Sequence, residues 1–138
     1  MKLNRILKGS RTAEIDSKAI SGGIDSKSLM KNAGSGISKG ITGDFENKKL
    51  NRAARGLVVC GRGNNGGDGF VAAKDLMNYG MRVIVFHISP VEEFSHDSLF
   101  YFKELKEAEN SDVYYLNLED KKISSSFKEE LELSLIHI

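Results

Sequence analysis

The chain has 138 residues, 40% hydrophobic and 28% charged, with a formal net charge of +1 and one cysteine. This length fits one domain, and the composition is that of a globular protein rather than a disordered one. The near-neutral charge gives no reason to expect nucleic acid or a membrane as partner, and one cysteine excludes an intrachain disulfide. Because we find neither a secretory signal nor an apolar run of about 18 residues, we expect a cytoplasmic protein.

Residues 1–45 predict a helical N-terminal region. A first helix is expected over residues 10–21, and Gly22-Gly23 stops it. A second helix follows, and Asp25 or Ser26 can cap its first turn.

The second helix carries apolar residues at every fourth position, namely Leu29, Ala33, Ile37 and Ile41. This spacing predicts a single apolar ridge. The helix also contains glycines that each weaken it by up to ~1 kcal/mol against alanine: Gly34, Gly36 and Gly40. We interpret these small residues as a sign of close packing against another backbone. The polar and basic residues 43–55 predict a surface connection.

Strands and helices then alternate over residues 56–118. Continuous apolar runs predict buried strands at 57–60, 83–88 and 113–116. Helical spacing predicts helices at 70–79 and 95–107, and the capping-box pattern Ser126-x-x-Glu129 predicts the start of another. This order predicts an α/β fold, a three-layer α/β/α Rossmann-like doubly wound parallel sheet with right-handed crossovers.

The C-terminal residues 119–138 do not complete that fold. The first strand of a doubly wound sheet usually lies centrally, so the strand at 57–60 would be left as an uncovered apolar edge. The sequence ends in the apolar run Leu133 to Ile138 without a turn. We therefore expect the N-terminal half of a single domain, with 119–138 as a truncated or unreliable tail. A complete three-stranded domain is the alternative.

The segment C-G-R-G-N-N-G-G-D-G-F, residues 60–70, lies between the first strand and the helix that follows it. Asn65-Gly66 is a hairpin-turn signal, but the residues that follow have helical spacing. Gly61-x-Gly63-x-x-Gly66 matches the dinucleotide-binding fingerprint, but no acid ends the second strand. In addition, Gly67-Asp68-Gly69 would delay the helix, so the third glycine could not serve strand–helix packing.

A third interpretation takes Asn64 to Gly69 as a site for an oxygen-rich ligand. Glycines let the backbone turn sharply and let a ligand approach main-chain amides, and a helix N-terminus supplies donors for a phosphate. Asp68 and the asparagine carbonyls are hard oxygen ligands for ribose hydroxyls or a cation. This combination suits a nucleotide-like ligand beside a metal ion. The structural alternative is that Asp68 only caps the helix.

The stretch V-V-C-G-R-G-N-N-G-G-D-G-F-V-A-A-K-D-L, residues 58–76, resembles the signature of the YjeF N-terminal domain family, the NAD(P)HX epimerases. These repair enzymes interconvert the R and S forms of hydrated NADH and NADPH. Ile15-Asp16 and the stretch G-I-D-S-K-S-L-M-K-N-A-G, residues 23–34, resemble the paired N-terminal helices of the family. The resemblance extends over about residues 10–118. It implies an isomerase of nicotinamide nucleotide repair, alone or as the N-terminal part of a bifunctional epimerase and ADP-dependent dehydratase.

The resemblance also implies a set of site residues. The hydrated nucleotide, NADHX or NADPHX, would bind to Asn64, Asn65, Gly66, Gly67 and Asp68. Asn65 would also bind a potassium ion as cofactor, and the protein would form a homodimer. The catalytic aspartate of the family lies beyond residue 138. We therefore expect no catalytic residue in this chain and no activity from residues 1–138 alone.

Two departures from the family pattern are visible. Lys31 stands where the family usually has a glutamate, which predicts a reversed charge near the site or the dimer surface. Asp25 replaces a usual proline, and both suit a helix start. Other functions stay open: a non-catalytic YjeF N-terminal module that binds RNA or protein as a dimer, and an NAD-dependent oxidoreductase.

The remaining chemically notable residues have simpler interpretations. Cys60 ends an apolar run, which favours a buried structural thiol over a nucleophile. His87 and His96 are acid–base candidates, but we interpret them as packed or solvated side chains. Tyr114 and Tyr115 are expected to alternate between the faces of the sheet.

Overall fold

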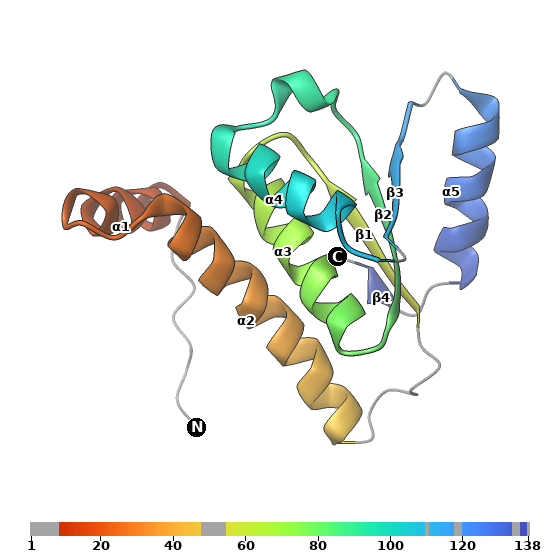
Figure 1. Ribbon diagram of the computed structural model, residues 1–138, viewed down its shortest axis with the longest axis horizontal. Helices are drawn as coiled ribbons and strands as arrows, with labels where there is room; N and C mark the ends of the chain where they lie inside the picture. Colours follow the sequence, from red (N-terminus) through yellow and green to blue (C-terminus); the bar gives the residue numbers. More distant parts are fainter. Residues whose placement is uncertain (1–8, 48–54, 110, 118–119, 134–135, 138) are drawn as a thin grey trace.

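The computed structural model describes residues 9–47, 55–109, 111–117, 120–133 and 136–137 (Figure 1). Helices and strands alternate from β1 onward, as expected. In chain order the elements are α1 (Gly9–Ser21), α2 (Ser26–Glu46), β1 (Arg55–Cys60), α3 (Asn64–Asn78), β2 (Arg82–His87), a 3₁₀ turn (Val91–Glu93), α4 (His96–Lys106), β3 (Asp112–Tyr115), α5 (Lys121–Leu133) and β4 (Ile136–His137).

The described strands form one parallel sheet in the order β3-β2-β1-β4. β1 pairs with β2 along its whole length, and Cys60 at the end of β1 lies opposite His87. The short β4 pairs with the start of β1, at Gly56 and Leu57. The expectation that the strand at 57–60 forms an uncovered edge is therefore wrong at Leu57.

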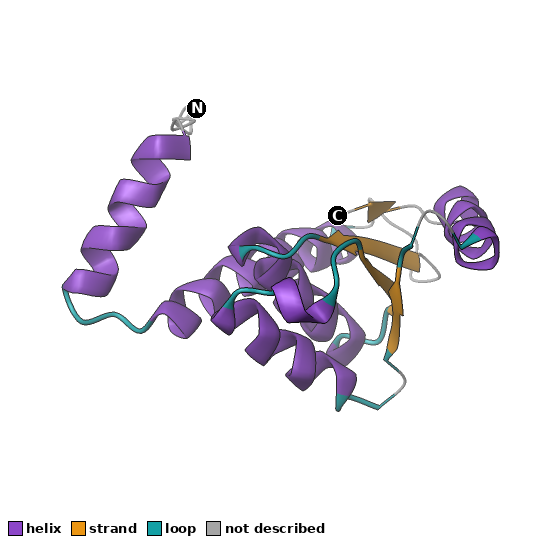
Figure 2. Ribbon diagram, turned by 90° about the horizontal axis from the view of Figure 1, so that it is seen from above, coloured by secondary structure: helices purple, strands orange, loops and turns teal. Residues whose placement is uncertain are grey.

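Helices cover both faces of the sheet, so the expected three-layer α/β/α arrangement is confirmed (Figures 1 and 2). α3 and α4 pack on one face, with α2 lying along α3, and α5 covers the other face. Alternating side chains of the strands build the two cores. The α3 side contains Val58, Cys60, Val83 and Val85 with Phe70, Leu76 and Leu105, and the α5 side contains Leu57, Ile84, Phe86, Leu116 and Phe127.

α1 differs from the other helices because none of its residues is buried, and it extends away from the body of the molecule (Figure 2). Ile15 and Ile20 are each 47% exposed. Among the helices that the structure describes, none has the length and apolar character needed to cross a bilayer.

α2 packs mainly through a face beside the expected ridge, although Ile41 of the ridge does pack against the core. Its buried residues are Met30, Gly34 and Ser38, one position along from the ridge, whereas Ala33 and Ile37 are exposed. Small residues on the buried face let α2 come close to α3. A Cβ on Gly34 would lie 2.6 Å from the carbonyl oxygen of Asp68.

Hydrogen bonds reinforce this contact between α2 and α3. The hydroxyls of Ser35 and Ser38 both donate to Oδ2 of Asp75, at 2.6 and 3.2 Å. The glycine interpretation is thus confirmed for Gly34. It is wrong for Gly36 and Gly40, because a Cβ at either position would meet nothing within 4 Å.

The helix starts show which capping predictions hold. Oδ2 of Asp25 accepts a hydrogen bond from the backbone N–H of Ser28 at 3.0 Å, so Asp25 caps α2. The capping-box prediction at Ser126 is wrong, since α5 already begins at Lys121. Oδ1 of Asp120 accepts from the N–H of Lys122 at 2.9 Å and serves that start instead.

Candidate functional site

The segment Asn64 to Gly69 is the first part of α3 and not a loop, so the predicted start of this helix at residue 70 is wrong. Gly63 is the N-cap residue with an extended backbone, and the N–H groups of Gly66 and Gly67 donate to its carbonyl at 3.0 and 3.2 Å. Positive φ angles occur among the described glycines only at Gly23 and Gly80. The segment therefore makes no sharp turn, which also excludes the hairpin.

The glycines of the segment instead let α3 pack against its neighbours. A Cβ on Gly66 would collide with the carbonyl oxygen of Gly61, and one on Gly69 would lie 2.8 Å from Sγ of Cys60. A Cβ on Gly67 would collide with Met30. The N-terminus of α3 therefore lies directly on the end of β1 and against α2.

This packing corrects one argument against the dinucleotide fingerprint, because Gly66 does serve strand–helix packing. The other observation against the fingerprint, the lack of an acid at the end of the second strand, is confirmed. β2 ends at His87 without an acid, and Glu92 and Glu93 follow in the 3₁₀ turn after Pro90. Glu93 forms an ion pair with Arg62 at 3.1 Å, in which both side chains are largely exposed.

In the described part of the chain, two pockets open on either side of Asn64 and Asn65. The strand-side pocket has a volume of about 600 Å³ and is lined by Val59, Gly61, Gly63, Asn64, Asn65 and Gly66. The helix-side pocket has about 130 Å³, and its polar lining consists of Asp16, Ser26, Asn64, Asn65, Asp68 and Asp97. The fold thus brings together residues from α1, α2, α3 and α4 around the predicted segment.

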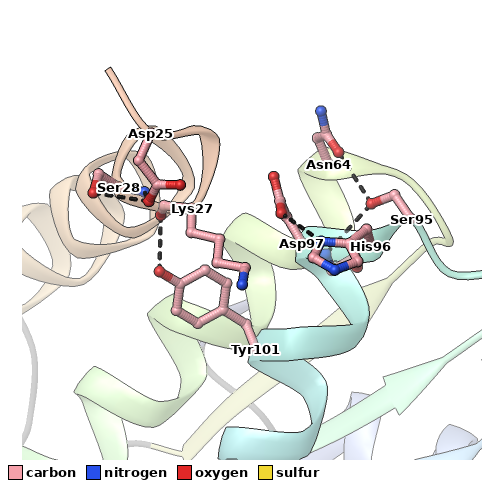
Figure 3. A network of polar contacts seen from close by, with 9 residues as sticks. Asp25, Lys27, Ser28, Asn64, Ser95, His96, Asp97 and Tyr101 are labelled. Carbon is pink, nitrogen blue, oxygen red and sulfur yellow. Dashed lines mark hydrogen bonds and ion pairs between the residues drawn. The ribbon is translucent and has the colours of Figure 1, made fainter. Parts of the chain in front are cut away.

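Asn64 is held by a residue of the next β/α unit. The hydroxyl of Ser95 donates to Oδ1 of Asn64 at 3.0 Å (Figure 3). The backbone N–H of Ser95 donates to the carbonyl of Arg62 at 2.9 Å. Asn65, next to it, has no hydrogen-bond partner for its side chain among the described residues, and its amide remains available to a ligand.

The pKa values of two carboxyl groups around the helix-side pocket are shifted in opposite directions. Burial, and then the charge of Asp16, raise the pKa of Asp68 to about 6. A hydrogen bond from Ser26 and the neighbouring His96 lower the pKa of Asp97, against a smaller opposing effect of burial. The pocket can therefore offer both a protonated and an ionised carboxyl group near pH 6. Asp68 lies in the second turn of α3, so the alternative that it only caps the helix is wrong.

Sequence reasoning did not assign site positions to Asp16, Ser26, Ser95 or Asp97. Asp16 was visible only as part of the family resemblance. Ser95 carried a local signal, since it precedes a helix, and it is the N-cap of α4. Its contact with Asn64, 31 positions earlier, depends on the tertiary fold.

Two other residues that the sequence analysis singled out, Lys31 and Cys60, lie outside these two pockets. Lys31 lines a separate pocket of about 220 Å³ with Lys74, Asp75 and Glu104, so the expected reversed charge does not face Asn64 and Asn65. Cys60 is 1% exposed, and burial raises the pKa of its thiol to about 12, as expected for a structural residue.

Both histidines agree with their simpler interpretation. His87 is 5% exposed, its Nδ1 lies 2.8 Å from the carbonyl oxygen of Ser89, and its ring stacks on Tyr115. His96 is exposed beside Asp97. Tyr114 contacts Phe86 on the α5 side of the sheet, so the expected alternation of the two tyrosines is confirmed.

The segment was also predicted to bind a metal ion. Within the described ranges, no group of three or more His, Cys, Asp or Glu side chains could hold one. A potassium ion takes neutral oxygens such as carbonyls and needs no such group of side chains. The amide oxygen of Asn65 suits such an ion as one ligand.

Comparisons with known proteins agree with the sequence resemblance. Residues 26–134 match the family described as YjeF-related protein N-terminus. A bifunctional NAD(P)H-hydrate repair enzyme of Moorella thermoacetica is 43% identical over 75 residues, which are 54% of this chain and 14% of that protein. An NAD(P)H-hydrate epimerase of Phaeosphaeria nodorum is 39% identical over 82 residues, 59% of this chain and 33% of that protein. The chain thus matches at most a third of the length of these two relatives.

A solved structure confirms the fold. The crystal structure of yeast ynu0 superposes with a TM-score of 0.74 at 23% sequence identity, over 97% of this chain and 55% of that chain. The chain therefore has the arrangement of helices and strands found in about half of the yeast protein.

Proposed function

Because the chain belongs to the YjeF-related protein N-terminus family, we propose that the whole protein is an NAD(P)H-hydrate epimerase. Its reaction would interconvert the R and S forms of hydrated NADH and NADPH. The observation that carries the proposal is the segment Asn64 to Gly69, placed at the carboxyl end of β1 between two pockets. Ligands of open α/β sheets bind at this edge.

The chemistry of the segment supports a nucleotide ligand. The first turn of α3 has backbone N–H groups without intrahelical acceptors, and the helix dipole favours an anion there. The phosphates of a nicotinamide nucleotide meet both requirements. The strand-side pocket, at about 600 Å³, has the size of a small-molecule site.

The proposal gives each residue of the segment a role in binding. Asn64 and Asn65 would hydrogen-bond the substrate, and Gly66 and Gly67, both buried, would let this helix start lie close to β1 and α2 beneath the bound nucleotide. Asp68, with a pKa of about 6, would accept from or donate to a ribose hydroxyl. Asn65 would also ligate potassium, which when bound would offset negative charge of the nucleotide.

Epimerisation at the hydrated carbon requires loss and re-addition of a hydroxyl group. That step needs an acid–base group at the leaving oxygen and a site that tolerates a cationic ring. Following the family resemblance, we assign the binding role to this chain and the acid–base role to an aspartate outside residues 1–138. The proposal also includes a homodimer and a cytoplasmic location, where reduced nicotinamide nucleotides are used.

The test uses the protein expressed from its complete gene. One purified epimer of NADPHX is incubated with the protein, and chromatography follows the approach to the R/S mixture. We expect equilibration faster than the spontaneous rate, a dependence on potassium, and a loss of at least about tenfold in kcat/KM for Asn65→Ala, about 1.4 kcal/mol. Gly36→Ala, on the open side of α2, is the matched control and should retain activity.

An absence of acceleration would refute the epimerase and leave a binding module. Reduction of an added electron acceptor by the bound nucleotide would instead favour an oxidoreductase. A hydrodynamic mass of one chain in solution would refute the homodimer but would not contradict the proposed epimerase activity.

A further inference from the structure

Ser95 occupies a joint between two β/α units. Its Oγ accepts from the backbone N–H of Ser98 at 3.4 Å, which makes it the N-cap of α4. Its own N–H donates to the carbonyl of Arg62, just before α3. The side chain and the backbone N–H of Ser95 are therefore each held by a contact with another backbone group.

These contacts leave the proton of the Ser95 hydroxyl free to be donated to a side chain. A serine hydroxyl has one proton to donate and two lone pairs. One lone pair accepts from the N–H of Ser98, and the proton is available to another acceptor. That acceptor is Oδ1 of Asn64, 3.0 Å away.

This hydrogen bond fixes the orientation of the Asn64 amide. Oδ1 faces Ser95, and Nδ2 points in the opposite direction (Figure 3). Asn64 lines both pockets, and because its oxygen is engaged by Ser95, its Nδ2 group is the part left for a ligand. Asn65 has no comparable restraint and can offer its oxygen.

We propose that Ser95 is a positioning residue that fixes Asn64 as a hydrogen-bond donor to an oxygen of the bound hydrated nucleotide. The proposal rests on the proposed function for the identity of the ligand. It assigns different polarities to adjacent asparagines: Asn64 donates to the substrate, and the oxygen of Asn65 is the one left for a cation.

The nearby Arg62–Glu93 ion pair does not replace this role. It joins the same two segments at 3.1 Å, but its side chains are 69% and 49% exposed. Such a pair contributes little in water and does not touch Asn64. Ser95 is the residue that acts on the amide.

Substitutions at Ser95 separate its two functions, which are accepting a hydrogen bond at the start of α4 and donating a hydrogen bond to Asn64. Ser95→Thr keeps both, and Ser95→Ala removes both. Ser95→Asp keeps an acceptor for the start of α4 but has no proton when ionised, so it reverses the polarity presented to Asn64. Asp25→Ala is the matched control, because it removes the cap of α2 without a contact to Asn64.

In the epimerase assay with the complete protein, Ser95→Asp should raise the KM for NADPHX about tenfold or more, with a smaller change in kcat. Ser95→Ala should raise it about three- to tenfold, as for one lost hydrogen bond. Ser95→Thr should stay within about twofold of the unmodified protein. Asp25→Ala should lower the melting temperature with KM unchanged. A KM for Ser95→Asp equal to that of the unmodified protein would overturn the proposal.

A second readout does not depend on the enzyme activity. Side-chain amide resonances of Asn64, assigned in ¹⁵N-labelled protein, report its orientation. In Ser95→Asp the amide should turn Nδ2 toward the carboxylate, which shifts one proton downfield and slows its exchange relative to the unmodified protein. An unchanged resonance would overturn the positioning role. If the unmodified protein does not epimerise NADPHX, the proposed function fails, and this measurement still decides whether Ser95 orients Asn64.

Discussion

The two long helices α2 and α3 are both rich in glycine, but their glycines lie in different surroundings. In α3, a Cβ on Gly66, Gly67 or Gly69 would meet another part of the chain at once. In α2 this is true of Gly34, whereas a Cβ on Gly36, Gly40 or Gly43 would meet nothing within 4 Å. A glycine in a helix therefore indicates close packing only where a neighbouring segment lies on its face.

Each glycine in a helix costs up to ~1 kcal/mol relative to alanine because it loses more backbone entropy on folding. At the start of α3 the contacts with β1 and α2 offset that cost, and the same closeness leaves Asp68 half-buried. On the open face of α2 no contact among the described residues offsets it.

The largest effect is expected for Gly66→Ala. The new methyl would collide with the backbone carbonyl of Gly61, the residue that directly follows β1. We expect a loss of about 3 kcal/mol in the free energy of unfolding, measured by urea denaturation. Gly61→Ala, where a Cβ would meet nothing within 4 Å, is the control. Equal stability of the two variants would contradict the packing role of Gly66.

Gly34→Ala should have the next largest effect. Its methyl would lie 2.5 Å from Cβ of Val71 and 2.6 Å from the carbonyl oxygen of Asp68, so α2 and α3 must separate. We expect a loss of about 2 kcal/mol in the same measurement. Gly36→Ala, two positions further along the helix, controls for the change in helix propensity. A neutral Gly34→Ala would show that the helices can move apart at no cost.

A smaller effect is expected from the charge of Asp68. Its folded-state pKa of about 6 exceeds the ordinary 3.8, so the folded protein holds the proton more strongly than the unfolded chain. This contribution to stability is full below pH 3.8 and is lost as the pH rises through 6. Since Asp68 is partly exposed, we expect a decline of about 1 kcal/mol over that range.

Thermal unfolding of Asp68→Asn between pH 4 and 7 tests this prediction, because the variant should lack the decline. Asp16→Asn should reduce it, since the charge of Asp16 is the second cause of the raised pKa. An identical pH dependence in the unmodified protein and Asp68→Asn would show that the carboxyl group is not desolvated.

The smallest effects should be stabilising. Gly36→Ala and Gly40→Ala add a methyl where nothing lies within 4 Å and remove backbone freedom from the unfolded chain. Each should raise the free energy of unfolding by about 0.5 to 1 kcal/mol, read from the urea midpoint. Destabilisation by either variant would mean that another surface covers this face of α2 in solution.

Much of the fold follows from the spacing of apolar residues. The runs at 57–60, 83–88 and 113–116 lie on or within one or two residues of β1, β2 and β3. Continuous apolar runs of that length suit strands in a parallel sheet covered by helices. The predicted start of α3 at residue 70 was wrong because asparagine and glycine are poor helix formers. Local propensity therefore favoured a loop over residues 64–69.

The predicted packing face of α2 was largely wrong for a related reason. The ridge from Leu29 to Ile41 has the larger side chains, but the packed face uses Met30, Gly34 and Ser38. Periodicity identifies a helix and its apolar side, whereas the closest approach of two helices depends on where small residues of one meet the backbone of the other.

The sequence by itself determined the order of strands and helices and the position of the candidate segment, Asn64 to Gly69, between β1 and the rest of α3. Both depend on local spacing and on residue types that are adjacent in the chain. Tertiary structure alone decided that the segment is helical, that Asp16 and Asp97 join it around one pocket, and that Ser95 donates a hydrogen bond to Asn64. These features depend on contacts between residues about 30 to 80 positions apart, whose geometry no local pattern contains.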